Sequence, residues 1–207
     1  MAIMNVNPTR MEMKRLQGRL KTASRGHKLL KDKTDEMIRR FITLAEQNKR
    51  LREETERELA NALNSFAEAR ANSDSRVVDE AILMPSRSIT IETSSHKVMG
   101  VDVPQIHIRD SGGEMYPYSF LTVCEGLDDA VRGVSAVVVK LIQLAEIEKT
   151  CNMLAEEIEK NKRRVNALEN IMIPQLTETI KYIKMKLDES ERSATVCLMK
   201  VKDIINN

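Results

Sequence analysis

The chain has 207 residues and a formal net charge of +2, and its composition argues against an ordinary globular core. Charged residues make up 31% of it and aromatic residues only 3%, with no tryptophan, so the large rings that fill most globular cores are nearly absent. Long helices suit this composition better. A pair of helices needs only a narrow apolar seam, and its remaining faces can carry charge.

The cysteines and the hydropathy pattern indicate where the chain is found. Cys124, Cys151 and Cys197 are far apart and form no CxxC pair, which predicts free thiols in a reducing compartment. No run approaches 18 apolar residues, and the N-terminus lacks the apolar core of a secretory signal. We therefore expect a cytoplasmic protein that associates with a membrane only indirectly.

The first long helix has a clear start. Asn7-Pro8-Thr9 precedes it, and Thr9 with Glu12 has the spacing of a capping box. The next proline is Pro85, which leaves about 75 residues of potential helix. Within it, apolar residues recur at steps of three and four, a heptad seam interrupted by polar residues such as Asn48. The predicted seam includes Leu16, Leu20, Leu30, Met37, Phe41, Leu44 and Leu51.

The middle of the chain changes from a helical to a strand-like period. Residues 87–93 read RSITIET and residues 97–103 read KVMGVDV, which predicts a β-hairpin whose strands are separated by a turn at Ser94–His96, while its register stays open. QIHIR, residues 105–109, is a candidate for a further short strand. A lone hairpin is marginal in water, so we expect this segment to pack against the helices or a partner.

The second long helix is predicted to begin near Asp128 and to run almost to Asn207. From residue 165 its seam steps as three, four, four, an eleven-residue period that favours a straight or slightly right-handed coil. Pro174 lies inside this helix and predicts a kink. The seam includes Val165, Leu168, Met172, Leu176, Ile183 and Leu187, and continues through Ser190, Ala194 and Leu198.

Two long amphipathic helices joined by about 40 residues predict an antiparallel pair, because neither apolar face is stable alone in water. The expected fold is dominated by α-helix: a long two-helix coiled-coil hairpin with a small β-hairpin segment between the helices. The predicted segments are residues 1–84 for the first helix, 85–126 for the central segment and 127–207 for the second helix.

The sequence offers no constellation for catalysis or for ligand binding. The three histidines are not at metal-ligand spacing with one another or with the cysteines. No Walker-type glycine loop, GxGxxG or GxSxG is present to hold a nucleotide or a nucleophile. We therefore predict a non-enzymatic chain with no cofactor, metal or nucleotide of its own.

A strongly basic stretch lies near the N-terminus. Residues 10–40 hold eleven Lys or Arg against four acids, which favours an acidic or polar partner. Gly18 and Gly26 lie within it, either because a partner's backbone approaches closely or because a long helix tolerates them. A nucleic-acid-binding rod is an alternative, but no aromatic residue is interleaved to stack on bases. We do not expect a nucleic-acid partner.

Two stretches carry a family resemblance. Residues 7–37 read NPTRMEMKRLQGRLKTASRGHKLLKDKTDEM, and residues 163–192 read RRVNALENIMIPQLTETIKYIKMKLDESER. Both closely resemble the D subunit of V/A-type rotary ATPases, and the similarity extends over nearly the whole chain. A freestanding coiled-coil adaptor would explain the periodicity but would leave both stretches as coincidence.

The resemblance implies a rotor shaft, the central stalk, that passes torque between a catalytic hexamer and a membrane ring. Its partners would be a hexamer of A and B subunits, the F subunit of the stalk, and the funnel-shaped subunit on the ring, at the cytoplasmic face of the membrane. The β-hairpin segment would lie at the side or foot of the shaft and tune activity. The candidate contacts to the hexamer are basic residues in the two matched stretches: Arg10, Arg15, Arg19, Arg25, Lys28, Arg163 and Arg164. For Arg163 and Arg164 two alternatives stay open, that they brace the coil or that they lie on a solvated face.

Overall fold

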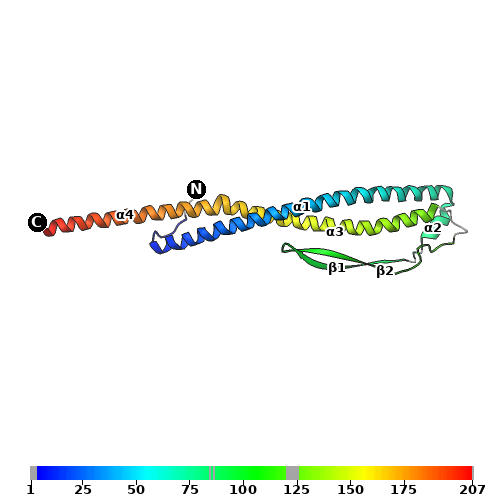
Figure 1. The fold of residues 1–207 in the computed structure, drawn as a ribbon, viewed down its shortest axis with the longest axis horizontal. Helices are drawn as coiled ribbons and strands as arrows, with labels where there is room; N and C mark the ends of the chain where they lie inside the picture. The colour runs from blue at the N-terminus through cyan, green and yellow to red at the C-terminus, as the bar shows by residue number, and fades with distance from the viewer. Residues whose placement is uncertain (1–3, 84, 86, 120–125, 207) are drawn as a thin grey trace. The chain divides into compact units, whose positions relative to one another are not determined.

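The computed structural model describes residues 4–83, 85, 87–119 and 126–206. Helices dominate, and a two-stranded antiparallel sheet lies between them in the chain (Figure 1). The elements are α1 (Arg10–Asn72), α2 (Ser75–Leu83), β1 (Ile89–Val98), β2 (Val101–Asp110), α3 (Gly126–Ala167), the π-helical turn η1 (Leu168–Met172) and α4 (Ile173–Asn206). This confirms the predicted fold class, a coiled coil of long helices with a β-hairpin between them.

The chain forms two compact units. Unit 1 holds residues 1–36 and 158–207, and unit 2 holds residues 37–157. α1 and α3 each contribute residues to both units.

In unit 1 the two helical segments are antiparallel, since Arg10 pairs with Glu191 and His27 with Glu169. Three fully buried residues, Leu16, Leu176 and Ile183, form its core. The segment before α1 closes one end of this core: Met4 packs against it and its amide donates to Thr179 Oγ1 at 3.2 Å.

The start of α1 follows half of the predicted capping box. Thr9 Oγ1 accepts the Glu12 amide at 3.2 Å, which satisfies one orphan donor of the first turn. The Thr9 amide donates to the Asn7 carbonyl at 2.9 Å, so the other half of the box is replaced by a backbone bond.

A π-helical turn lies just before Pro174, the position where a kink was predicted. Residues 168–172 are π-helical, and the Ile173 amide donates to the Leu168 carbonyl, five residues back. Proline cannot donate this kind of bond, and a single π-turn is a common way to accommodate such a break inside a long helix.

In unit 2, α1 and α3 run antiparallel at very close range (Figure 1). A Cβ built on Gly133 would lie 2.9 Å from the Cβ of Ala62, and one built on Gly126 would lie 3.6 Å from that of Ala69. Both pairs are seven residues apart on each helix, so the seam here uses its smallest residues at the points of closest approach.

A second small core lies where α1 ends in unit 2. Ala69, Val78 and Leu127 are buried together, with Phe66 and Tyr118 packed against them. α2 supplies Val78 and is therefore held against the helix pair.

The helix predicted to run to about residue 84 ends earlier, at Asn72. Asp74 explains the break: its side chain accepts the Arg76 amide at 3.2 Å and its carbonyl accepts the Val77 amide at 3.0 Å. These bonds start α2 as a separate helix.

The β-hairpin exists, but its predicted turn was wrong. β1 and β2 pair over ten residues each, from Ile89 opposite Asp110 to Val98 opposite Val101. The turn is Met99-Gly100, with φ of 52° and 86°, the pattern of a type I′ turn. Residues 105–109 belong to β2 and do not form a third strand.

Most predicted seam residues are shielded from solvent. Leu16, Met37, Val165, Leu176 and Ile183 are buried, and Leu20, Leu30, Phe41, Leu44, Leu51, Leu168 and Leu187 are partly buried. Met172 departs from the prediction, because it ends the π-turn and is 44% exposed. The predicted continuation through Ser190, Ala194 and Leu198 is exposed as well.

Candidate interaction surfaces

The basic residues near the start of α1 are all exposed, as a surface for partners requires. Arg10 pairs with Glu191, and Arg15 lies 3.4 Å from Glu12. Arg19, Arg25 and Lys28 have no charged partner among the residues that the structure describes. Among the predicted contact residues of α1, these three are therefore the ones most available to an acidic partner.

Arg163 and Arg164 are exposed in the same unit but are used locally. Arg163 pairs with Glu159 one turn earlier, and Arg164 donates to Asn161 Oδ1 at 3.3 Å. Asn161 is 1% exposed and lies in the seam. Arg164 therefore helps to satisfy a buried amide of the coil.

The last turns of α4 form an apolar surface that was not predicted from the sequence. Every described residue after Leu187 is exposed. Glu191, which pairs with Arg10, is the last described residue of α4 with a hydrogen bond or ion pair to α1. About 15 residues follow Glu191, roughly 22 Å of helix. Its exposed large side chains are Val196, Leu198, Met199, Val201, Ile204 and Ile205. No local pattern in the sequence marks this overhang, because its extent depends on the register in which α4 packs against α1.

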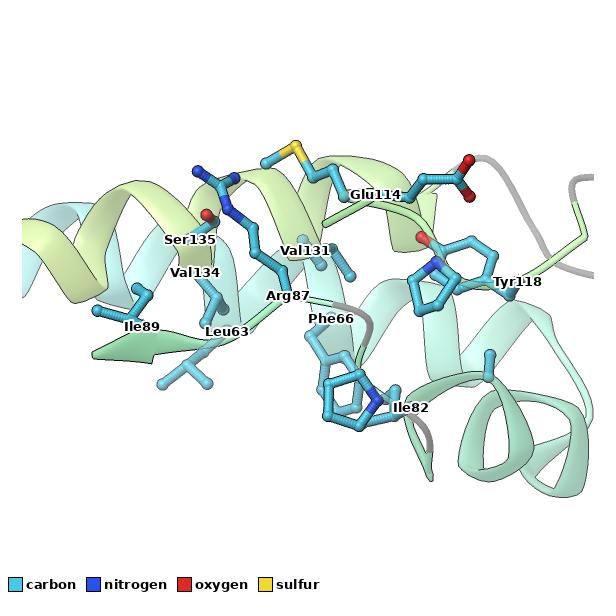
Figure 2. Close-up of a pocket in the computed structure, with 15 residues that line it drawn as sticks. Leu63, Phe66, Ile82, Arg87, Ile89, Glu114, Tyr118, Val131, Val134 and Ser135 are labelled. Atoms are coloured by element: carbon cyan, nitrogen blue, oxygen red, sulfur yellow. The ribbon is translucent and has the colours of Figure 1, made fainter. Parts of the chain in front are cut away.

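Unit 2 contains an apolar cavity of about 470 Å³, shown in Figure 2. Leu63 and Phe66 of α1, Val131 and Val134 of α3 and Ile82 of α2 contribute apolar side chains to its lining. Ile82 is 47% exposed and Leu63 is 53% exposed. The cavity is suited to apolar side chains, since its wall carries few groups that could bind a polar ligand.

Two polar pairs stand at the rim of this cavity. Tyr118 donates to Asp128 at 2.7 Å, and burial together with this bond raises the pKa of the tyrosine. Arg87 makes a bidentate contact with Asp110 and lowers the pKa of that carboxyl to about 2, with help from the Gly112 amide. Arg87 thereby fixes the base of the hairpin.

An ionic cluster links the helices of unit 2. Lys140 of α3 bonds Glu54 at 2.5 Å and Glu58 at 2.6 Å, both on α1. The hydrogen bonds that Lys140 donates to the two carboxylates raise its pKa, and the bond to Glu54 lowers the pKa of that carboxyl. Arg52 adds a second link to Glu148 at 3.3 Å.

The thiols and ionisable groups form no reactive site within the described residues. Cys151 and Cys197 are free, as predicted, and burial raises the pKa of Cys151. Cys124 lies outside the described residues. In the described part of the chain, no three His, Cys, Asp or Glu side chains are grouped to hold a metal ion. None of the described helices is both long and apolar enough to cross a membrane.

Comparison with known proteins agrees with this architecture. The family model for the D subunit of ATP synthase matches residues 12–203. The chain belongs to this family. The D subunit of the V-type ATP synthase of Thermoanaerobacter sp. (strain X514) is 47% identical over 206 residues, covering 99% of both chains. The D subunits of the V-type ATP synthases of Clostridium novyi (strain NT) and Acetivibrio thermocellus are 49% and 50% identical over 99% of this chain and 97% and 94% of their own length.

Membership of this family agrees with the resemblance carried by residues 7–37 and 163–192. Unit 1 brings most of these two stretches together, because it contains residues 1–36 and 158–207. The predicted contact residues Arg10, Arg19 and Arg163 therefore belong to one unit, together with the apolar end of α4.

Proposed function

We propose that the chain is the central rotor shaft of a V-type ATP synthase and transmits torque within that complex. The chain has no catalytic role in this proposal. Its function is to remain stiff while ATP-driven changes in a surrounding hexamer of A and B subunits turn it, or while an ion gradient turns it in reverse. We place it on the cytoplasmic face of the membrane, held there through other subunits.

The observation that supports this proposal most strongly is the close packing of α1 and α3 in unit 2, together with the ion pairs that join them. At Gly133 and Ala62 the two backbones approach so closely that not even one added methyl group would fit, and such close packing opposes sliding of one helix along the other. Lys140 and Arg52 add charged links between the same helices. Helices that cannot slide past each other resist twist as one body, which a torque-bearing element needs.

For unit 1 we propose contact with the hexamer. The unpaired cations Arg19, Arg25 and Lys28 would interact with acidic or carbonyl groups of the hexamer, and Arg10, Arg15, Arg163 and Arg164 would contribute around them. The apolar end of α4 would enter the centre of the hexamer, where its exposed side chains would be shielded from water. The F subunit of the stalk and a funnel-shaped subunit on the membrane ring are the proposed partners elsewhere.

Rotation can be tested directly in the assembled complex. A bead attached to this chain, with the hexamer fixed to a surface, should rotate in steps when ATP is added and stop when a non-hydrolysable analogue replaces it. A bead on a chain that stays still while the complex hydrolyses ATP would disprove the shaft role.

The hexamer contacts need a separate test. Substitution of Arg19, Arg25 and Lys28 by Gln should weaken assembly with the hexamer, increasingly so at higher salt. The matched control replaces Lys49, Arg50 and Arg57, exposed residues of α1 in unit 2, by Gln, which removes the same charge. Equal effects of the two triple variants would show that net charge matters and that these positions do not.

A further inference from the structure

The two outer edges of the β-hairpin differ. Along β2, Pro104 has no amide proton, and the Ile106 amide donates to Glu146 Oε2 of α3 at 3.3 Å. Val103 is 0% exposed. The outer edge of β2 is therefore blocked in its middle, at Pro104 and Ile106, so a further strand cannot pair along its length.

The geometry of the turn shows which groups of β1 face outward. Val98 and Val101 flank a two-residue turn, so they form a hydrogen-bonded pair, and such pairs alternate with non-bonded pairs along an antiparallel ladder. Thr93 and Ile106 then form a non-bonded pair, which agrees with the bond from Ile106 to Glu146. The backbone amides and carbonyls that point away from β2 are those of Ile89, Ile91, Thr93, Ser95 and Lys97, and these five are called the outward residues of β1.

This outer edge of β1 is open along its length. Residues 90–97 are all exposed, and β1 pairs only with β2 in the part of the chain that the structure describes. β1 contains no proline, and its ten-residue pairing with β2 is continuous without a bulge. Proline, bulges, charged side chains and covering elements are the usual means by which proteins protect a strand edge. Among the outward residues of β1 only Lys97, next to the turn, is charged, so residues 89–95 remain a template for another strand.

We propose that the outer edge of β1 binds an extended segment of a partner protein, which adds a third strand to the sheet. The backbone of the partner would bond to the outward amides and carbonyls, and its side chains would set the register. On one face, Ile91 is 49% exposed and lies opposite Ile108, so the partner carries an apolar residue beside Ile91. On the other face, Glu92 pairs with Arg109 at 2.9 Å, so a basic or hydroxyl side chain fits beside Glu92.

A second copy of this chain fits the edge poorly. Two β1 strands paired antiparallel over most of their length must match outward residues with outward residues. Ile91 would then lie opposite a threonine, a serine or a lysine, and its side chain would gain no large apolar neighbour. The edge therefore favours a different protein.

The proposal goes beyond the role of the shaft, since the edge would be occupied whether the coil turns or stands still. The test is amide hydrogen exchange, resolved to single residues, on the isolated chain and on the ATP synthase complex purified from native cells. The amides of Ile91, Thr93 and Ser95 should exchange at least ten times more slowly in the complex. The amides of Glu92 and Ser94, already bonded to β2, should be protected in both samples.

Two results would overturn this inference. Fast exchange of Ile91, Thr93 and Ser95 in the complex would show that no strand pairs with the edge. Protection that appears in the isolated chain and disappears on dilution would show a second copy there in place of a partner. Neither result bears on rotation of the bead, so failure of this inference and failure of the shaft role can be told apart.

A pair of variants tests the backbone bond itself. Thr93→Pro removes one outward donor and places a ring on the open edge, where proline is tolerated, so the added protection in the complex should be lost. Thr93→Val keeps the donor and should keep the protection. Unchanged protection in Thr93→Pro would overturn the inference, and if the proline opens the hairpin, the exchange of the unmodified complex decides alone.

Discussion

The two units use the same antiparallel pairing of helices in different ways. In unit 2 the seam brings glycine and alanine into contact, and charged pairs, α2 and the hairpin brace it from outside. In unit 1 large aliphatic side chains fill the seam, and α4 continues beyond its partner with apolar residues exposed. The difference shows how one coiled coil combines a close, rigid section with a section that leaves surface for partners.

The largest expected effect lies in the core of unit 1. Leu176 is 2% exposed, so Leu176→Asp removes its packing and places an unpaired carboxylate among Leu16 and Ile183. We expect a loss of at least ~3 kcal/mol in the free energy of unfolding, measured by urea denaturation followed by circular dichroism.

Leu198→Asp is the matched control, because Leu198 is 70% exposed on α4. Its effect on the isolated chain should stay within about 0.5 kcal/mol. A large loss of stability in Leu198→Asp would mean that the end of α4 is packed in solution. It would contradict the difference between the buried first part of α4 and its exposed end.

The next largest effect is a difference in stability between alanine substitutions of a glycine in each unit, Gly133 and Gly18. In Gly133→Ala the new Cβ would lie 2.9 Å from the Cβ of Ala62, so the helices must move apart, at a cost of about 1–3 kcal/mol that exceeds the gain in helix propensity. Gly18 has no atom within 4 Å of a built Cβ, so Gly18→Ala should stabilise the isolated chain by up to about 1 kcal/mol. Thermal unfolding of both variants measures the difference.

The same pair of variants also addresses the two interpretations of Gly18. If Gly18→Ala stabilises the isolated chain but weakens assembly with the hexamer, a partner's backbone approaches this glycine. If assembly is unaffected, the glycine is simply tolerated in a long helix. Destabilisation of the isolated chain by Gly18→Ala would contradict the open space around this residue.

A smaller effect is expected from the ionic cluster of unit 2. Lys140→Met leaves Glu54 and Glu58, one turn apart on α1, without their shared cation, so their repulsion should lower stability and raise the pKa of Glu54. In the background of Glu54→Gln and Glu58→Gln, the same Lys140→Met change should have less effect. Equal effects in both backgrounds would show that the cluster contributes no coupling.

The smallest effect is local and depends on pH. The pKa of Asp110 is lowered from 3.8 to about 2, mainly by the hydrogen bond from Arg87. A lowered pKa means that this bond contributes stability fully above about pH 4 and loses it as pH falls through 2. Exchange protection at the base of the hairpin, followed by NMR, should fall over that range.

Arg87→Gln provides the control for the pH dependence. It should return the pKa of Asp110 toward 3.8 and leave the hairpin base less protected at neutral pH. If the chemical shifts of Asp110 titrate alike with and without Arg87, the guanidinium does not hold the carboxyl in solution.

The β-hairpin shows how far the sequence pattern could be interpreted. The alternation of ITIET and VDV correctly indicated strands, but the polar run Ser94–His96 was wrongly predicted to be the turn. The turn forms at Met99-Gly100, because only that register pairs ten residues on each side and closes with two positive φ angles. The break before α2 had a signal in the sequence, since Asp74 is a good helix cap.

The sequence by itself determined the long helices, the start of α1 at Thr9 and most of the seam, because capping and heptad periodicity are local properties of the chain. Only the tertiary structure decided how far the seam extends and which surfaces stay open. A residue such as Leu198 has the right spacing for burial, but burial needs a partner opposite it, and the first helix begins too late to provide one. Likewise, the contact of Ile106 with Glu146 of α3, 40 positions apart in the chain, blocks the edge of β2 and leaves that of β1 as the open one.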